Sequence, residues 1–197
     1  MTEQENEILK IVIHGRGGQG AVTASQIIVE AAFLSENFAD VTAFPSFGAE
    51  RRGAPIQAYA KLSKNKKIWD RSSIEEPDIL IVFDASVLDQ QIVASLKPDG
   101  IFIVNSNKDP QYFKKIYNLS DRTKIIVADI NKLAIENNLL IDGNPIVNTP
   151  ILGLLAKAIP DLSLENLKKI IKNRMNEELS EINNKLIEEG YKLAKTL

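Results

Sequence analysis

The segment from residue 11 to residue 32, IVIHGRGGQGAVTASQIIVEAA, constrains the fold of this chain more strongly than any other. An aliphatic run leads into six residues of which four are glycine, and apolar residues then recur at close to helical spacing. The segment therefore predicts a strand, a tight glycine turn and a helix over residues 22–33. Such a turn is open to three interpretations: a dinucleotide site, another anion-binding loop, or a turn that packs the helix closely onto a sheet.

The glycine turn has the chemistry of an anion site. Glycines let the backbone approach a ligand, and a helix N-terminus offers free N–H groups and the positive end of a dipole. Five residues are candidates for this site: Arg16, Gly17, Gly18, Gln19 and Gly20. NAD binding would also need a carboxylate at the far end of the second strand, whereas Asp40 falls at its start. The lysine of a Walker A motif is missing, which excludes a P-loop.

Composition excludes several classes of protein. The 197 residues include no cysteine, which rules out disulfides, a cysteine nucleophile and an iron–sulfur cluster held by this chain alone. The one histidine, His14, leaves no histidine-rich metal site. A net charge of −2 and the lack of a long apolar run argue against nucleic acid and membrane as partners. We expect a soluble, cytoplasmic protein without a signal peptide, and we interpret the basic run at residues 61–67 as a solvated hairpin end.

Buried strands recur along the middle of the chain. Continuous aliphatic runs at residues 78–84, 101–105 and 124–130 predict strands that are covered on both faces. Shorter strands are expected at residues 41–44 and 56–62, and the alternating pattern of the latter predicts one solvated face. Strands that alternate with helices indicate a parallel sheet. The predicted fold class is α/β, with a Rossmann-like, mostly parallel, doubly wound sheet and a helical C-terminal portion.

The last third of the chain, from about residue 148 to residue 197, is expected to be helical. Thr149 is placed to cap a helix that has Pro150 in its first turn, and Ser163 is placed to cap the next one. A third helix would bury a stripe that consists of Leu179, Ile182, Leu186 and Tyr191. Because no repeat or long linker interrupts the pattern, residues 1–197 are expected to form a single domain.

A second unusual stretch, FPSFGAERRGAP at residues 44–55, combines prolines, glycines, phenylalanines and adjacent arginines. It leaves the same edge of the predicted sheet as the glycine turn, where ligands of open α/β sheets bind. The arginines could clamp a phosphate or a carboxylate, and arginine and aromatic residues are enriched at protein interfaces. A solvated loop with a surface ion pair is the alternative. The candidate residues are Phe47, Gly48, Glu50, Arg51, Arg52 and Gly53.

Catalytic groups are scarce in this sequence. His14 is expected to pack beside the turn, and Ser25 has no histidine partner. Asp84 and Asn105 are expected to be turn or cap residues at strand ends. Because no nucleophile–base pair or carboxylate dyad is evident, we assign no catalytic residue and no metal site to this chain.

Several stretches resemble one known family. GRGGQGAVTASQIIVEAAF and FPSFGAERRGAPIQAY are similar to the gamma subunits of pyruvate:ferredoxin oxidoreductases, in the 2-oxoacid:acceptor oxidoreductase family. PDILIVFDASVL, NTPILGLLAKA and EINNKLIEEGYKLA also match, so the resemblance covers nearly the whole chain. The loop PSFGAERRGAP resembles the pyruvate-type chain (pyruvate synthase), whereas relatives acting on 2-oxoglutarate tend to have a single arginine before glycine.

The resemblance implies a non-catalytic subunit of a catalytic assembly of anaerobic metabolism. In that family, pyruvate, coenzyme A (CoA) and oxidised ferredoxin give acetyl-CoA, CO₂ and reduced ferredoxin. Thiamine diphosphate with Mg²⁺ and the 4Fe–4S clusters belong to other subunits, so this chain alone would bind no cofactor. The implied partners are the alpha, beta and delta subunits, and ferredoxin through the complex.

The resemblance also implies that the two unusual loops lie near CoA or at a subunit interface. One functional surface would then consist of Arg16, Gly17, Gly18, Gln19 and Gly20 together with Phe47, Gly48, Glu50, Arg51, Arg52 and Gly53. The isolated chain would be inactive. A free-standing NAD-binding oxidoreductase and a purely structural assembly module remain alternatives.

Overall fold

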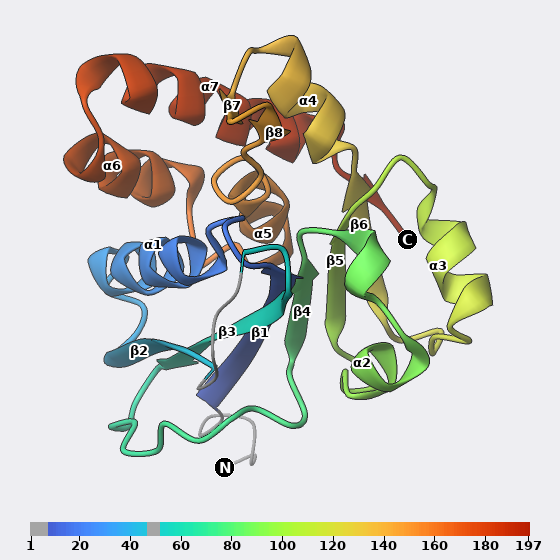
Figure 1. Ribbon diagram of the computed structural model, residues 1–197. Coiled ribbons are helices and arrows are strands. Elements are labelled where there is room, and N and C mark those ends of the chain that lie inside the picture. Colours follow the sequence, from blue (N-terminus) through green and yellow to red (C-terminus); the bar gives the residue numbers. More distant parts are fainter. Residues whose placement is uncertain (1–7, 47–51) are drawn as a thin grey trace.

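The computed structural model describes residues 8–46 and 52–197 (Figure 1). The strands are β1 (Ile8–Arg16), β2 (Asp40–Pro45), β3 (Pro55–Ser63), β4 (Ile79–Val82), β5 (Ile101–Asn105), β6 (Lys124–Ala128), β7 (Leu140–Ile141), β8 (Asn144–Pro145) and β9 (Lys195–Thr196). The helices are α1 (Ala21–Leu34), α2 (Gln90–Ala94), α3 (Pro110–Ile116), α4 (Ile130–Glu136), α5 (Leu152–Ala158), α6 (Leu164–Arg174) and α7 (Glu177–Leu193), and a short 3₁₀ turn, η2 (Ala85–Val87), follows β4. Within the described residues, none of the helices has the length and apolar character needed to cross a membrane.

Seven strands form one mixed sheet in the order β2-β3-β1-β4-β5-β6-β9. β1, β4, β5 and β6 are parallel neighbours, whereas the pairs β2–β3, β3–β1 and β6–β9 are antiparallel. The α/β class is confirmed, but the expectation of a mostly parallel sheet was wrong. Only nine residues (46–54) join β2 to β3, too few for the crossover that a parallel pair needs. β9 has only two residues, too few for a recognisable pattern.

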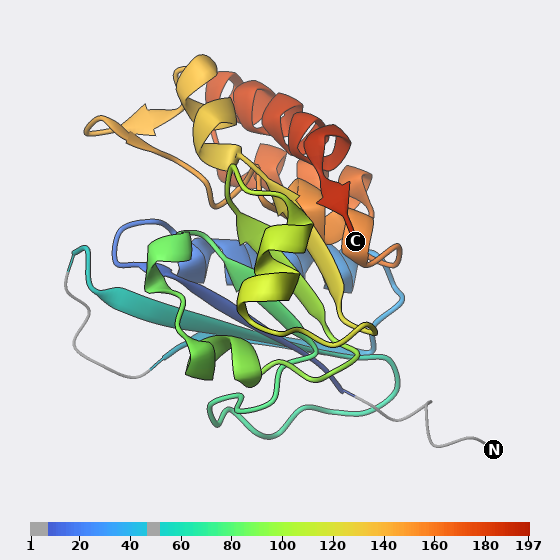
Figure 2. The ribbon, with the colours of Figure 1, turned by 90° about the vertical axis from the view of Figure 1, so that its right-hand side faces the viewer.

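Helices cover both faces of the sheet (Figures 1 and 2). α1 and the helices α4 to α7 share one apolar core with strand residues such as Ile11 and Ile13. α2 and α3 pack on the other face, against alternate strand residues such as Val12. Every residue of β4 is buried, as expected for a strand covered on both sides. With both faces occupied, the carboxyl edge of the parallel strands is where a ligand of such a sheet would bind.

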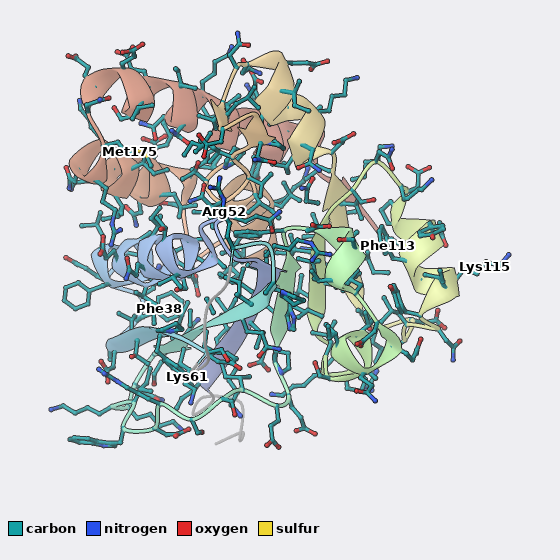
Figure 3. All side chains as sticks on the ribbon, in the orientation of Figure 1. Phe38, Arg52, Lys61, Phe113, Lys115 and Met175 are labelled. Carbon is teal, nitrogen blue, oxygen red and sulfur yellow. The ribbon has the colours of Figure 1, made fainter. Side chains whose placement is uncertain are left out.

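β3 differs from the half-exposed strand that its alternating pattern predicted. It lies between β1 and β2, and residues 58–63 are all buried. Lys61, which the pattern assigned to the solvated face, is 3% exposed, and its Nζ donates to Asp70 Oδ2 at 2.7 Å. Figure 3 shows Lys61 at the lower end of the sheet. The interpretation of residues 61–67 as a solvated hairpin end was therefore wrong for Lys61, because the connection after β3 folds back over its side chain.

Of the two helix caps expected in the C-terminal portion, one is confirmed. Ser163 caps α6, since its Oγ accepts from Asn166 N at 3.2 Å. Thr149 does not cap α5, because its hydroxyl donates to Asn183 Oδ1 on α7. The chain turns through residues 149–151 before α5 begins, so the polar side chain is used to join two helices rather than to start one.

The buried face of α7 also differs from the expected stripe. Leu186 is buried, but Leu179 and Tyr191 are 46% and 36% exposed. Gly190 instead faces the start of α5, where the Pro150 carbonyl oxygen lies 2.5 Å from the position that a Cβ would take. The buried face of α7 is therefore set mainly by the close approach of α7 to α5, and less by the periodicity of its apolar residues.

Candidate functional site

The turn between β1 and α1 requires glycine at two residues. Gly18 and Gly20 have φ angles of 94° and 77°, in the left-handed region that other residues rarely adopt. Gln19 closes the turn, since its Oε1 accepts from Arg16 N at 2.7 Å. Gly20 is the N-cap of α1 and offers no side chain to the first N–H groups, which lack partners within the helix. α1 therefore directs these donors and the positive end of its dipole to the carboxyl edge of the sheet.

The second unusual loop ends directly beside this turn. Gly17 N donates to Ala54 O at 2.8 Å, and Gly53 N donates to Gly17 O at 3.0 Å. The structure thus brings residues 52–54 against the glycine turn, at the edge where both loops were expected to lie. Four further candidates, Phe47, Gly48, Glu50 and Arg51, lie outside the described residues.

Arg16 joins the glycine turn to two other elements. Its Nε donates to Asp84 Oδ2 at 2.9 Å, its Nη1 to Gly53 O at 3.0 Å and its Nη2 to Ser86 Oγ at 2.7 Å. Partial burial acts to raise the pKa of Asp84, but hydrogen bonds from Ser86 and Arg16 outweigh it and hold the pKa below its usual range. The charge of Arg16 is therefore balanced within the chain, and its guanidinium joins the glycine turn to Gly53 and to residues 84–86.

Arg52 has a different environment. Its Nη2 donates to Asp142 Oδ2 at 2.7 Å, and the two side chains are 75% and 67% exposed. Asp142 lies in the turn of the β7–β8 hairpin, so the pair links this hairpin to the glycine turn. Figure 3 shows Arg52 above the start of α1. An ion pair this exposed stabilises little, and the guanidinium can exchange the carboxylate for another anion.

Asn148 is a site residue that the sequence did not reveal. Its side chain abuts Gly20, because the Nδ2 atom lies 2.4 Å from the position that a Cβ on Gly20 would take. Asn148 is 9% exposed, and its buried Oδ1 has no hydrogen-bond partner within the described residues. Unpaired buried polar atoms are rare in folded proteins. In the sequence, the NTP segment that contains Asn148 indicates a helix cap at Thr149 and matches the family, and neither signal points to the Asn148 side chain.

The remaining polar candidates do not converge on this edge as a catalytic set. Burial lowers the pKa of His14 to about 4, against a smaller opposing effect of Asp89. Ser25 Oγ donates to Val22 O inside α1, and Asn105 Oδ1 accepts from the backbone at the start of α4. In the part of the chain that the structure describes, no three acidic, histidine or cysteine side chains are grouped to hold a metal ion.

Asp40 lies at the opposite end of the strands from the glycine turn. It is the first residue of β2, as the sequence predicted, and its carboxylate accepts from Val41 N at 3.0 Å and Ile68 N at 2.6 Å. Asp40 is therefore not placed to hold the ribose of an NAD molecule bound at the glycine turn.

Comparison with known proteins identifies the family. Residues 10–193 match the pyruvate ferredoxin/flavodoxin oxidoreductase family. The chain belongs to this family. It is 41% identical over 185 residues to the common gamma subunit of the pyruvate/ketoisovalerate oxidoreductases of Pyrococcus furiosus, and the match covers 93% of this chain and 96% of that one. It is 40% identical to pyruvate synthase subunit PorC of Methanocaldococcus jannaschii, with the same coverage. The expected gamma-type subunit of a 2-oxoacid:ferredoxin oxidoreductase is therefore confirmed.

One solved structure supports this assignment, and a second shows the fold. The pyruvate oxidoreductase subunit PORC of Thermotoga maritima superposes with a TM-score of 0.81 and 34% identity, covering 96% of this chain and 98% of that chain. The 2-oxoglutarate:ferredoxin oxidoreductase of Magnetococcus marinus has a TM-score of 0.74 but 19% identity, covering 95% of this chain and 31% of that chain. This second likeness shows a common fold: the gamma-type fold occurs there as one part of a longer chain.

Proposed function

We propose that this chain serves a complex in which pyruvate, CoA and oxidised ferredoxin give acetyl-CoA, CO₂ and reduced ferredoxin, and that it supplies a binding surface without a catalytic group. The partners are the alpha, beta and delta subunits, which hold the thiamine diphosphate, Mg²⁺ and 4Fe–4S clusters. The surface, here called the carboxyl-edge site, consists of residues 15–20, residues 52–54 and Asn148. It contacts a neighbouring subunit and part of CoA.

The unpartnered Oδ1 of Asn148 beside the N-terminus of α1 is the observation that carries the CoA part of this proposal. CoA contains phosphate groups, which accept hydrogen bonds, and amide groups, which both donate and accept. The first N–H groups of α1 suit a phosphate, and the amide of Asn148 suits either kind of group. Arg52, whose guanidinium is largely exposed, could add a charge. The related Magnetococcus marinus enzyme was solved with CoA bound, which is consistent with this assignment.

The β7–β8 hairpin supports the subunit-contact part. Leu140 and Ile141 are 38% and 62% exposed, although both are large and apolar. Figure 2 shows the hairpin projecting from the body of the chain. The exposed ion pair between Arg52 and Asp142 places the tip of this apolar hairpin next to the loop that borders the glycine turn. Exposed apolar groups next to an arginine are typical of protein interfaces.

Two sets of variants test the proposal in the complex purified from its native host. Replacing Arg51 and Arg52 together by Ala should weaken assembly or raise the apparent KM for CoA. Asn148→Ala should raise the KM for CoA several-fold and leave the subunit composition unchanged. Arg122→Ala is the matched control, because Arg122 is exposed in the connection between α3 and β6, away from both loops.

The outcomes separate the competing functions. Loss of subunits without any change in the KM for CoA would favour the purely structural module. Saturable NAD binding by the isolated chain would favour a free-standing oxidoreductase. If neither assembly nor kinetics changes in either set of variants, the carboxyl-edge site has no role in the complex.

A further inference from the structure

The connection between β3 and β4, residues 64–78, presents the most exposed large apolar side chain in the described part of the protein. Trp69, the one tryptophan of the sequence, is 84% exposed, and the Lys67 Nζ atom lies 5.6 Å from the centroid of its ring. Exposure of so much aromatic surface is unfavourable in water, and tryptophan is strongly enriched among the residues that dominate binding energy at interfaces. In Figures 1 and 2 the connection lies at the opposite end of the strands from the glycine turn. The carboxyl-edge site therefore does not explain Trp69.

Hydrogen bonds on both sides of Trp69 hold the connection in one conformation. Before it, Ile68 N donates to Asp40 Oδ2 at 2.6 Å. After it, the buried Lys61 ammonium donates to Asp70 Oδ2 at 2.7 Å and to Ser72 O at 3.3 Å. A side chain displayed on a braced loop loses less conformational entropy on binding than one on a loose loop. These hydrogen bonds therefore fix the backbone on both sides of Trp69.

Within three residues of Trp69 along the chain, the charged side chains are three cations and Asp70, whereas Glu75 and Glu76 follow further along the same connection. Lys64 and Asp70 are engaged in ion pairs within the chain. Lys66, Lys67 and Arg71 are exposed, and the ion pairs of the described residues include none of these three. They form a local cationic patch on a chain whose net charge is −2. A partner that covers Trp69 must therefore bring negative charge close to these side chains.

We propose that Trp69 with Lys66, Lys67 and Arg71, here called the Trp69 loop, docks on an acidic surface of another subunit of the same oxidoreductase. This second interface is separate from the carboxyl-edge site, and it rests on the proposed function only in that the chain works inside a multi-subunit complex. The tryptophan fills an apolar depression and the three cations meet carboxylates at its rim. A nucleic acid or an anionic membrane fits less well, because polyanions are bound through many phosphate contacts and this loop offers only three cations.

Charge and aromatic variants in the native complex test this interface. The first is Trp69→Ala, and the second reverses charge with Lys66→Glu, Lys67→Glu and Arg71→Glu. Their matched controls are Phe33→Ala, since Phe33 is 66% exposed on α1, and the triple reversal Lys115→Glu, Lys169→Glu and Lys172→Glu at exposed lysines on α3 and α6. Circular dichroism of each purified chain checks that the exposed substitutions leave it folded.

The readout is the retention of each subunit on a tagged gamma chain as salt is raised. Trp69→Ala should weaken the affinity of one subunit for the gamma chain by roughly 10-fold or more. Such a loss is typical of a tryptophan that dominates an interface. The triple charge reversal should weaken this affinity at low salt and remove its salt dependence. Retention equal to the wild type in both variants would overturn the proposal.

Oxidative footprinting gives an independent measurement. Hydroxyl-radical labelling of Trp69 in the isolated chain should be strong and should fall several-fold in the intact complex. Labelling of Tyr112, which is exposed on α3, serves as an internal reference. Equal labelling of Trp69 in both states would show that no subunit covers it. If the wild-type chain retains no other subunit at all, the proposed function fails; if the complex forms with Trp69 still labelled, only this second interface fails.

Discussion

The Nε atom of Arg16 lies 2.9 Å from Oδ2 of Asp84, although the two residues are 68 positions apart in the chain. Arg16 ends β1, and Asp84 follows β4, the parallel neighbour of β1. The pair therefore ties the glycine turn to the next strand of the sheet. Because the same guanidinium also donates to Gly53 O, one side chain joins three segments at the carboxyl edge.

Asp84→Asn should loosen this edge. The substitution keeps the size of the side chain and removes its charge, so the free energy of unfolding at pH 7 should fall by about 1 kcal/mol, because the pair is partly exposed. Since the pKa of Asp84 is lowered in the folded chain, its contribution is present above the ordinary carboxyl pKa and is lost as pH falls through the folded value. Urea unfolding at several pH values measures this, with Asp99→Asn as an exposed control. If the difference in unfolding free energy between the wild type and Asp84→Asn persisted unchanged at strongly acid pH, the charge-based explanation would be contradicted.

Gly20→Ala should be much more damaging than an ordinary substitution at a helix start. The left-handed φ of 77° costs about 1–2 kcal/mol for alanine, and the contact with Asn148 adds about 1–3 kcal/mol of overpacking. Adding Asn148→Ala removes the closest atoms, so the double variant should recover part of the loss and keep the backbone strain. Urea unfolding of both single variants and the double variant measures the coupling. Strictly additive losses would mean that the two residues do not collide.

His14 should make the chain less stable at mildly acid pH. Burial lowers its pKa to about 4, whereas the unfolded chain binds a proton near 6.5. The contribution of neutral His14 to the free energy of unfolding is therefore fully present above pH 6.5. It is lost as the pH drops from 6.5 to 4, which lowers the free energy of unfolding by about 3 kcal/mol at most. His14 is the one histidine, so His14→Asn should flatten the dependence between pH 7 and pH 5. We would compare unfolding free energies of the two chains across this range; parallel curves would show that His14 is not the titrating group.

Gly190→Ala should destabilise the chain even though alanine is the better helix former. Helix propensity alone predicts a gain of roughly 0.5–1 kcal/mol. A Cβ at this position would lie 2.5 Å from the Pro150 carbonyl oxygen, which belongs to the backbone and cannot move easily. We expect a net loss of about 1–3 kcal/mol by thermal or urea unfolding. Lys192→Ala on the exposed side of α7 should change little, and a stabilised Gly190→Ala variant would show that α5 and α7 can separate without loss.

Local features of the structure follow closely from local patterns in the sequence. The glycine turn, α1, the fully buried β4 and the Ser163 cap were all predicted. Each depends on interactions within a few residues or on a run of apolar side chains long enough to reveal its burial. Such signals say which side of an element is buried, but they do not say which other element buries it.

The sequence by itself determined the order and type of the main elements, and its long motifs determined the family. Tertiary structure alone decided the antiparallel insertion of β3 between β1 and β2, the burial of Lys61, and the position of Asn148 against Gly20. It also decided the pairing of Arg16 with Asp84. The physical reason is that these contacts join segments distant in the chain, and their free energy depends on which strands and helices pack together, which no local periodicity records.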